Sequence, residues 1–182
     1  MILPKVFAVV KRSEPVVGIT DSVELNDILI RLDGEIENAS EFRKKLESPP
    51  YNYKFKSGSS SEVIGALIEV YLTMGHDLET SASLATVDML GNFRFVVSYK
   101  TIPVVAGFTR GLPLYVLKNS TEVQVTSSIS TYSEIYSMQD DEVVSVVYPD
   151  VIMMYDAKSL KLEPKPISFQ TALISELIKS TK

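Results

Sequence analysis

The side chains that could do chemistry in this sequence are carboxylates, hydroxyls and a single imidazole. The chain contains no cysteine, and His76 is its one histidine. Structural zinc sites use four Cys or His ligands and catalytic zinc sites usually use three protein ligands, so nearly every zinc site is excluded. A thiol nucleophile is excluded as well. We expect no metal and no cofactor, and only an all-carboxylate magnesium or calcium site stays open.

Two groups of acidic residues could carry acid–base chemistry or hold a cation. Glu35 and Glu37 alternate with Ile36, which indicates a solvated face rather than a glycosidase-type carboxylate pair. The acidic run at residues 140–142 lacks the alternating spacing of a calcium loop, so we interpret it as a solvated turn. His76 falls between two predicted helices, which predicts an exposed loop histidine rather than a catalytic base.

A serine cluster at residues 57–61 is a candidate for binding rather than catalysis. A helix is expected to begin there, and the free N–H groups of a helix start can hold an anion. Arg110 could complement such a site. The simpler interpretation is that these serines only start the helix.

The helices and strands that position these side chains can be predicted from helix-capping residues and from the spacing of apolar residues. Short β-rich runs at residues 5–11, 15–20 and 27–32 open the chain, and the Asp-Gly pair at residues 33–34 is expected to break the third. Asn38 stands three residues before Glu41, a capping-box-like start for a helix over residues 39–47.

Two further helices are expected in the middle of the chain. The first starts at Ser59, which can form a capping box with Glu62, and ends at Gly75. Its apolar residues recur at helical spacing: Val63, Leu67, Val70, Tyr71 and Met74. The second runs from an Asp77 cap to Gly91, with apolar residues at Leu78, Ala82, Ala85 and Met89. Two consecutive helices with apolar faces imply a layer lying on a sheet.

From residue 92 onward the apolar period changes to two, which is typical of strands. Strands are expected at residues 93–99, 104–108, 114–117, 123–126, 143–148, 151–155 and 160–163. An amphipathic tail follows at residues 168–179. Strands, then helices, then a long antiparallel run with a closing helix predict an α+β layered domain in which sheet packs on sheet.

Length and composition fit one globular domain of 182 residues, with 45% apolar and 23% charged residues. The net charge is −5 and the one basic cluster is at residues 43–45, which disfavours nucleic-acid binding. No apolar run is long enough to span a bilayer, and the start has neither a basic leader nor a cleavage site. We therefore expect a cytoplasmic protein that contacts neither nucleic acid nor membrane.

Several segments, taken in order, resemble the glutaminase domain of class II glutamine amidotransferases, particularly the glucosamine-6-phosphate synthase branch. Residues 28–38 are similar to that family's strand, Asn-Gly turn and Ile-Glu-Asn, and residues 42–46 to its next helix. Residues 57–64, Ser-Gly-Ser-Ser-Ser-Glu-Val-Ile, resemble its Ser-x-Thr-Asp-Thr-Glu-Val-Ile. Three shorter matches follow: Gly-Leu-Pro-Leu at 111–114 with Gly-Ser-Pro-Leu, Thr-Ser-Ser at 126–128 with Ala-Ser-Asp, and Tyr-Pro-Asp-Val at 148–151 with Glu-Gly-Asp-Ile.

The resemblance implies the four-layer α-β-β-α sandwich of N-terminal-nucleophile hydrolases, with a shortened N-terminal part. Only some thirty residues precede Asp33, whereas the family has a longer segment there that holds its nucleophile loop and a glutamine-binding Arg. We expect residues 1–167 to form the amidotransferase-like domain and residues 168–182 to be its C-terminal amphipathic helix or tail.

Three requirements of the family mechanism are not met. The family uses a Cys at residue 1, but Met1 stands here and is expected to be retained because Ile2 is large. The family's oxyanion hole uses an Asn side chain and a Gly N–H, but Asp33 replaces the Asn before Gly34. Ser60 takes the place of the Asp that binds the α-amino group of glutamine.

These losses favour a catalytically inactive relative that acts as an interaction or regulatory module, with a second copy or a synthase or transferase subunit as partner. The alternative is a small-molecule binder of an amine, an amino acid or a sugar phosphate that uses the vestigial pocket. An acidic residue there would prefer an amine or a cation. A hydrolase with a relocated nucleophile ranks last, because no Ser-His-Asp order appears. We assign no catalytic residue; the candidate pocket residues are Asp33, Gly34, Ser57, Ser59, Ser60 and Arg110.

Overall fold

The structure is a computed structural model that describes residues 6–11, 17–19, 23–99, 102–118, 122–127, 143–147, 151–156 and 161–166. In chain order its elements are β1 (Val6–Lys11), β2 (Val17–Ile19), β3 (Val23–Leu25), β4 (Ile28–Ile36), α1 (Ala39–Glu47), α2 (Ser60–Thr73), α3 (Leu78–Thr86), β5 (Gly91–Tyr99), β6 (Ile102–Arg110), β7 (Leu114–Lys118), β8 (Glu122–Thr126), β9 (Val143–Val147), β10 (Val151–Asp156) and β11 (Lys161–Pro166).

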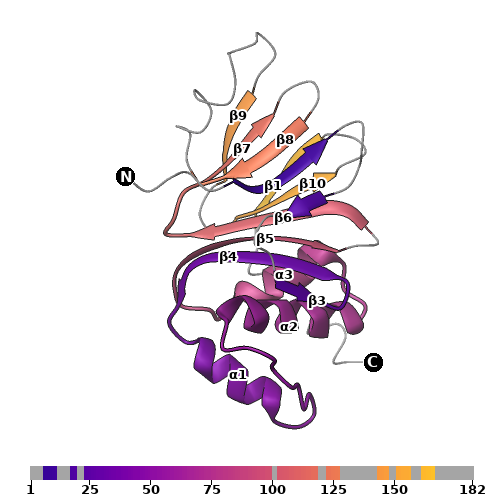
Figure 1. The fold of residues 1–182 in the computed structure, drawn as a ribbon, viewed down its shortest axis with the longest axis vertical. Coiled ribbons are helices and arrows are strands. Elements are labelled where there is room, and N and C mark those ends of the chain that lie inside the picture. Colours follow the sequence, from indigo (N-terminus) through magenta and orange to yellow (C-terminus); the bar gives the residue numbers. More distant parts are fainter. Residues whose placement is uncertain are drawn as a thin grey trace.

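The strands form two antiparallel sheets, one with the order β2-β1-β8-β7-β9 and one with the order β11-β10-β6-β5-β4-β3. The chain changes sheets at residues 111–113, where β6 of one sheet leads into β7 of the other. Inside the sandwich, the side chain of Leu114 lies against Gly107 of the opposite sheet. Figure 1 shows the sheets stacked, with α2 and α3 on the outer face of the β4–β6 sheet and α1 at the end of the molecule.

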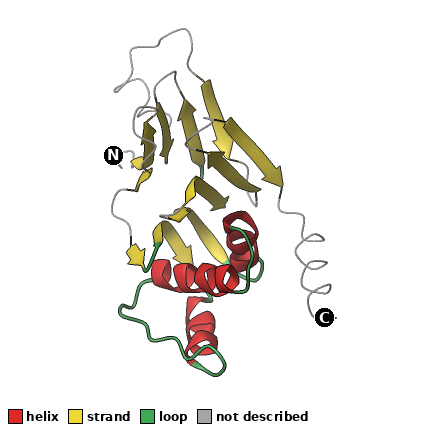
Figure 2. Ribbon diagram, turned by 90° about the vertical axis from the view of Figure 1, so that its right-hand side faces the viewer, coloured by secondary structure: helices red, strands yellow, loops and turns green. Residues whose placement is uncertain are grey.

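The predicted α+β fold class with sheet on sheet is confirmed. Figure 2 shows the described helices gathered on one side of the strands. Within the described residues the layers are therefore helix, sheet and sheet, which are three of the four layers that the resemblance implies. Among these residues, no helix is long and apolar enough to cross a membrane.

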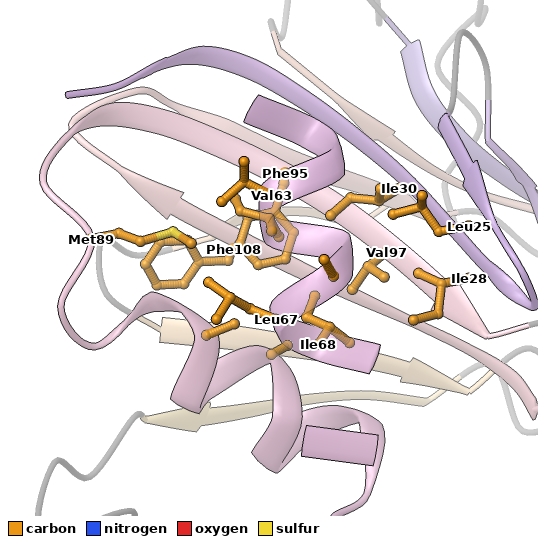
Figure 3. Packing of buried hydrophobic residues seen from close by; sticks show 14 of the residues in the cluster. Leu25, Ile28, Ile30, Val63, Leu67, Ile68, Met89, Phe95, Val97 and Phe108 are labelled. Carbon is orange, nitrogen blue, oxygen red and sulfur yellow. The ribbon is translucent and has the colours of Figure 1, made fainter. Parts of the chain in front are cut away.

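The core lies between α2 and the sheet. Val63, Leu67 and Ile68 of α2 point toward Phe95 and other apolar side chains of the strands (Figure 3). Gly65 lets the helix come close to β3, because the side chain of Leu25 occupies the space where a Cβ would stand. The helix is buried more completely than an amphipathic pattern predicts, since α1 and α3 also pack against it. Only its end emerges, where Met74 is 53% exposed.

The prediction that Asp33 and Gly34 break the third strand is wrong. Both residues lie inside β4, where they pair with Arg94 and Phe93 of β5. Gly34 has φ +101°, and a Cβ there would lie 2.8 Å from the Phe93 Cα atom and still closer to the Asn92 carbonyl oxygen. The glycine therefore lets β4 continue past a close approach to β5 instead of ending it.

The first helix, α1, spans the predicted residues 39–47, but its predicted capping box and the predicted end of α3 need correction. Asn38 precedes α1, but its side chain makes no cap hydrogen bond; it donates to the Asp88 carbonyl and accepts from the Leu90 N–H, at 2.8 and 2.9 Å. The helix α3 ends at Thr86, so Met89 is buried in the turn beyond it and Gly91 opens β5. In both cases a contact between distant segments overrides the local signal. The Asp77 cap of α3 and the positive φ of Gly75 are as predicted.

Two leucines test whether α1 is held by the core. Leu46 is 1% exposed and Leu90 is 58% exposed. Leu46→Ala should lower the free energy of unfolding by about 3 kcal/mol, because a buried leucine loses its contacts and leaves a cavity. Leu90→Ala, the same change at the surface, should stay within about 0.5 kcal/mol. Urea unfolding followed by circular dichroism measures both, and equal losses would contradict the packing of α1.

Candidate functional site

The candidate site is built around an ion pair between neighbouring strands. Asp33 and Arg94 stand opposite each other in the β4–β5 register. The carboxylate of Asp33 accepts from Nε of Arg94 at 3.0 Å and from Nη2 at 2.5 Å. The side chains of Arg94 and Asp33 are 11% and 24% exposed, so the pair is largely removed from solvent. The acidic residue in the predicted pocket is thus already matched by a cation from the same chain.

A third segment closes over this pair. The Nη1 group of Arg94 donates to the carbonyl of Pro113, and the side chain of Leu112 lies over Gly34. Gly111 forms a bridge with Phe93, and its positive φ of 73° lets it sit against the Asn92 side chain. The structure thus brings together two segments that carry the sequence resemblance, at 33–34 and 111–114.

The serine cluster is organised by a buried carboxylate. Glu62 is 1% exposed, and it accepts hydrogen bonds from the N–H groups of Lys56 and Ser57 at 2.7 Å and from the Ser57 hydroxyl at 2.6 Å. Ser59 caps α2 by accepting from the Ser61 N–H. The predicted capping box is therefore half right: Ser59 is the N-cap, but Glu62 reaches back to residues 56–57 instead of to Ser59.

The hydrogen bonds to Glu62 change its acidity. Burial raises the pKa of the Glu62 carboxyl, but the N–H groups of Lys56 and Ser57, the Ser57 hydroxyl and the charge of Arg43 together lower it below its ordinary value of 4.5. The carboxylate is therefore charged at neutral pH and holds the segment before α2. Ser60, the first residue of α2, is partly exposed beside it.

The two arginines near these segments have different surroundings. Arg110 donates to the carbonyl of Met89, and its guanidinium lies 5.7 and 5.6 Å from the ring centres of Phe93 and Phe108. Arg43 of α1 instead lies by the serine cluster, where it donates to the Ser59 carbonyl at 3.4 Å. Its guanidinium also stacks over Phe55 at 4.0 Å.

Sequence reasoning selected Arg110 and missed both Arg43 and Arg94. Arg43 approaches the serine cluster through the packing of α1 beside α2, and Arg94 meets Asp33 through the β4–β5 register. If β4 and β5 are predicted to pair as antiparallel strands, their register can place Arg94 opposite Asp33. No pattern in the neighbouring sequence predicts that Arg43 approaches the serine cluster.

The other polar residues considered in the sequence, Glu35, Glu37 and His76, lie at exposed or partly exposed positions. Glu35 and Glu37 are exposed, and His76 is a partly exposed loop residue whose ring meets Tyr71 edge-on. Within the described residues, no three His, Cys, Asp or Glu side chains are grouped to hold a metal ion. Met1, the acidic run at 140–142 and the tail at 168–179 lie outside the described residues.

A double-mutant cycle tests the ion pair. Asp33→Asn and Arg94→Met should each destabilise the fold, because each leaves a largely buried charge without its partner. The coupling free energy should be about 1–2 kcal/mol, between the values of exposed and fully buried pairs. Urea unfolding of the two single variants and the double variant measures it. A coupling near zero would show that the pair is a geometric coincidence.

The carboxylate of Glu62 gives a pH-dependent prediction. Glu62→Gln should lower the free energy of unfolding at neutral pH by about 2 kcal/mol, because charge-assisted hydrogen bonds are lost. The folded pKa is lowered, so this contribution is present above the ordinary value of 4.5 and is lost as the pH falls through the folded value.

The difference in the free energy of unfolding between Glu62→Gln and the unaltered chain should therefore shrink as the pH falls below 4.5. Urea unfolding at a series of pH values measures it. Glu47→Gln, at an exposed position of α1, should cause little change at any pH. A difference for Glu62 that does not change with pH would refute the role of its charge.

We compared the sequence and the structure of this chain with those of known proteins. Neither a scan against protein-family models nor a sequence comparison with curated proteins found a match. Solved structures are similar. Glutamine phosphoribosylpyrophosphate amidotransferase from B. subtilis, complexed with ADP and GMP, has a TM-score of 0.64 and 17% identity over 81% of this chain and 31% of its own.

Two further structures agree. One, described as the allosteric regulatory enzyme of purine biosynthesis, has a TM-score of 0.64 and 17% identity over 80% of this chain and 30% of its own. A glutamine aminotransferase class-II domain protein from Silicibacter pomeroyi has a TM-score of 0.54 and 13% identity over 80% of this chain and 69% of its own. This chain spans about 31% and 30% of the first two proteins. The resemblance found in the sequence is confirmed at the level of the fold: the chain has the α+β fold of glutamine amidotransferase domains.

Proposed function

We propose that this chain is a catalytically inactive relative of the glutaminase domain, and that it acts as an interaction or regulatory module. The observation that carries this proposal is the Asp33–Arg94 ion pair. By the sequence resemblance, Asp33 occupies the position of the Asn that donates a hydrogen bond to the oxyanion in a glutaminase.

The chemistry of amide opening explains why this pair matters. A tetrahedral intermediate carries a negative oxygen, and losing one neutral donor to it costs roughly 3 kcal/mol of barrier. The Asp33 carboxylate is only an acceptor, so it offers no hydrogen bond to that oxygen. Arg94 is held by other acceptors, because Nε and Nη2 donate to Asp33 and Nη1 donates to the Pro113 carbonyl.

Two sequence features support the same proposal. The chain contains no cysteine, so it supplies no thiol to attack an amide. Ser60 stands in place of the family's carboxylate for the α-amino group, and a hydroxyl offers no charge to an ammonium ion. The losses concern three different roles, so restoring one of them would not restore the reaction.

An interaction role fits what remains of the fold. In the first two similar structures this fold makes up about a third of a longer chain, so there it works next to other protein. We propose that here the partner is a second copy of the chain or a separate synthase or transferase subunit. The alternative, a vestigial pocket that binds an amine through Asp33, is disfavoured because Arg94 already neutralises that carboxylate.

A glutaminase assay tests the proposal. The purified chain incubated with glutamine should release no glutamate above the buffer rate, measured by a coupled dehydrogenase assay at several pH values. Asp33→Asn restores the neutral side chain but not the nucleophile, so it should also be inactive. A known glutaminase in the same buffer serves as the positive control. Glutamate release that disappears in the Asp33 variant would overturn the proposal.

A further inference from the structure

A groove lies at the opposite end of β4 from Asp33. It is lined by eight residues from the β3–β4 turn, the last turns of α2 and the end of β5: Leu25, Asn26, Asp27, Ile28, Glu69, Leu72, Thr73 and Tyr99. Ile28 and Asp33 are five positions apart in one strand, so the two places are separated by roughly 17 Å. The groove is therefore a separate site, and its chemistry does not depend on the proposed function.

The groove has an apolar floor and a polar rim. Leu25 and Ile28 are 4% and 1% exposed and belong to the core, and Figure 3 shows them together at the end away from Met89. Leu72 and Tyr99 pack partly buried against the same core. The exposed side chains of Asn26 and Asp27 form the rim on the turn. A ligand here would meet apolar surface below and polar groups above.

The charge of the groove has one sign. Asp27 and Glu69 are carboxylates, and none of the eight lining residues is Lys, Arg or His. The amide Nδ2 of Asn26 donates to Oε1 of Glu69, so one carboxylate is tied to the β3–β4 turn. Asn26 holds this position with φ 51°, a conformation that Asn tolerates better than most residues. The arrangement is the reverse of the Asp33 site, where an arginine already stands against the carboxylate.

We propose that this groove binds a small organic cation, an alkylammonium ion with a short apolar stem. The ammonium group would lie between the carboxylates of Asp27 and Glu69, and the stem would lie against the partly buried side chains of Leu72 and Tyr99. The cavity has a volume of about 280 Å³, just below the range usual for drug-sized ligands, so a ligand of a few heavy atoms fits it. Anions are repelled by both carboxylates, and a neutral alcohol gains only the apolar contact.

A titration with matched small molecules tests the proposal. The full ¹⁵N-labelled chain is titrated with n-butylammonium, n-butanol and butyrate at constant ionic strength, and amide shifts are followed by NMR. Butylammonium should give saturating shifts at residues 25–28, 69–73 and 99, whereas butanol and butyrate should not. Equal shifts with butanol, or no localised shifts with butylammonium, would overturn it.

Charge-neutral variants locate the binding. Asp27→Asn and Glu69→Gln keep the shape and an acceptor oxygen, so the new amide at position 69 can still accept from Asn26. Each should raise the Kd for butylammonium roughly fivefold, the factor for one unit charge at about 4 Å in water. The matched control Glu47→Gln removes a charge from an exposed position of α1 and should leave the Kd unchanged. Equal Kd values in all three variants would refute the role of the two carboxylates, and the amide spectra show that each variant is folded.

Discussion

The burial of α2 against the β4–β6 sheet is the interaction on which the rest of this structure depends. The helix starts at the Glu62 network and ends at the acidic groove, so one packed element positions both places. Ile64, Leu67 and Ile68 in its middle belong to the same buried core cluster as Phe95 and Phe108. Because the two ends are joined by a rigid, apolar helix, a loss of core packing would disturb both together.

The two ends of β4 differ in how their charges are balanced. At one end Asp33 is held by Arg94, which also donates to the Pro113 carbonyl, so its charge is used inside the protein. At the other end Asp27 and Glu69 face a groove whose lining has no cation. A carboxylate paired with an arginine has little to offer a ligand, whereas two carboxylates in a groove whose described lining has no cation can attract one. The proposed cationic ligand therefore suits the groove better than the position of Asp33.

The fold and the proposed loss of activity are compatible because they depend on different residues. The sandwich is held by apolar side chains and by strand register, and these tolerate the replacement of polar groups at the edge. The oxyanion position depends on one donor aimed at one oxygen. The Asp33 carboxylate is accommodated by Arg94, its partner across the β4–β5 strand pair.

Local signals in the sequence determined where most elements lie. The period-two pattern predicted β5–β8 and the sheet-on-sheet class, and Asp77 and Gly75 marked helix ends correctly, because these depend only on neighbouring residues. Only the tertiary structure decided what Asp33, Asn38 and Glu62 do. Asp33 meets Arg94 through strand register, Asn38 bonds to the α3–β5 turn, and Glu62 reaches residues 56–57. Their partners are set by packing between segments that are remote in sequence or folded back, which a local pattern does not encode.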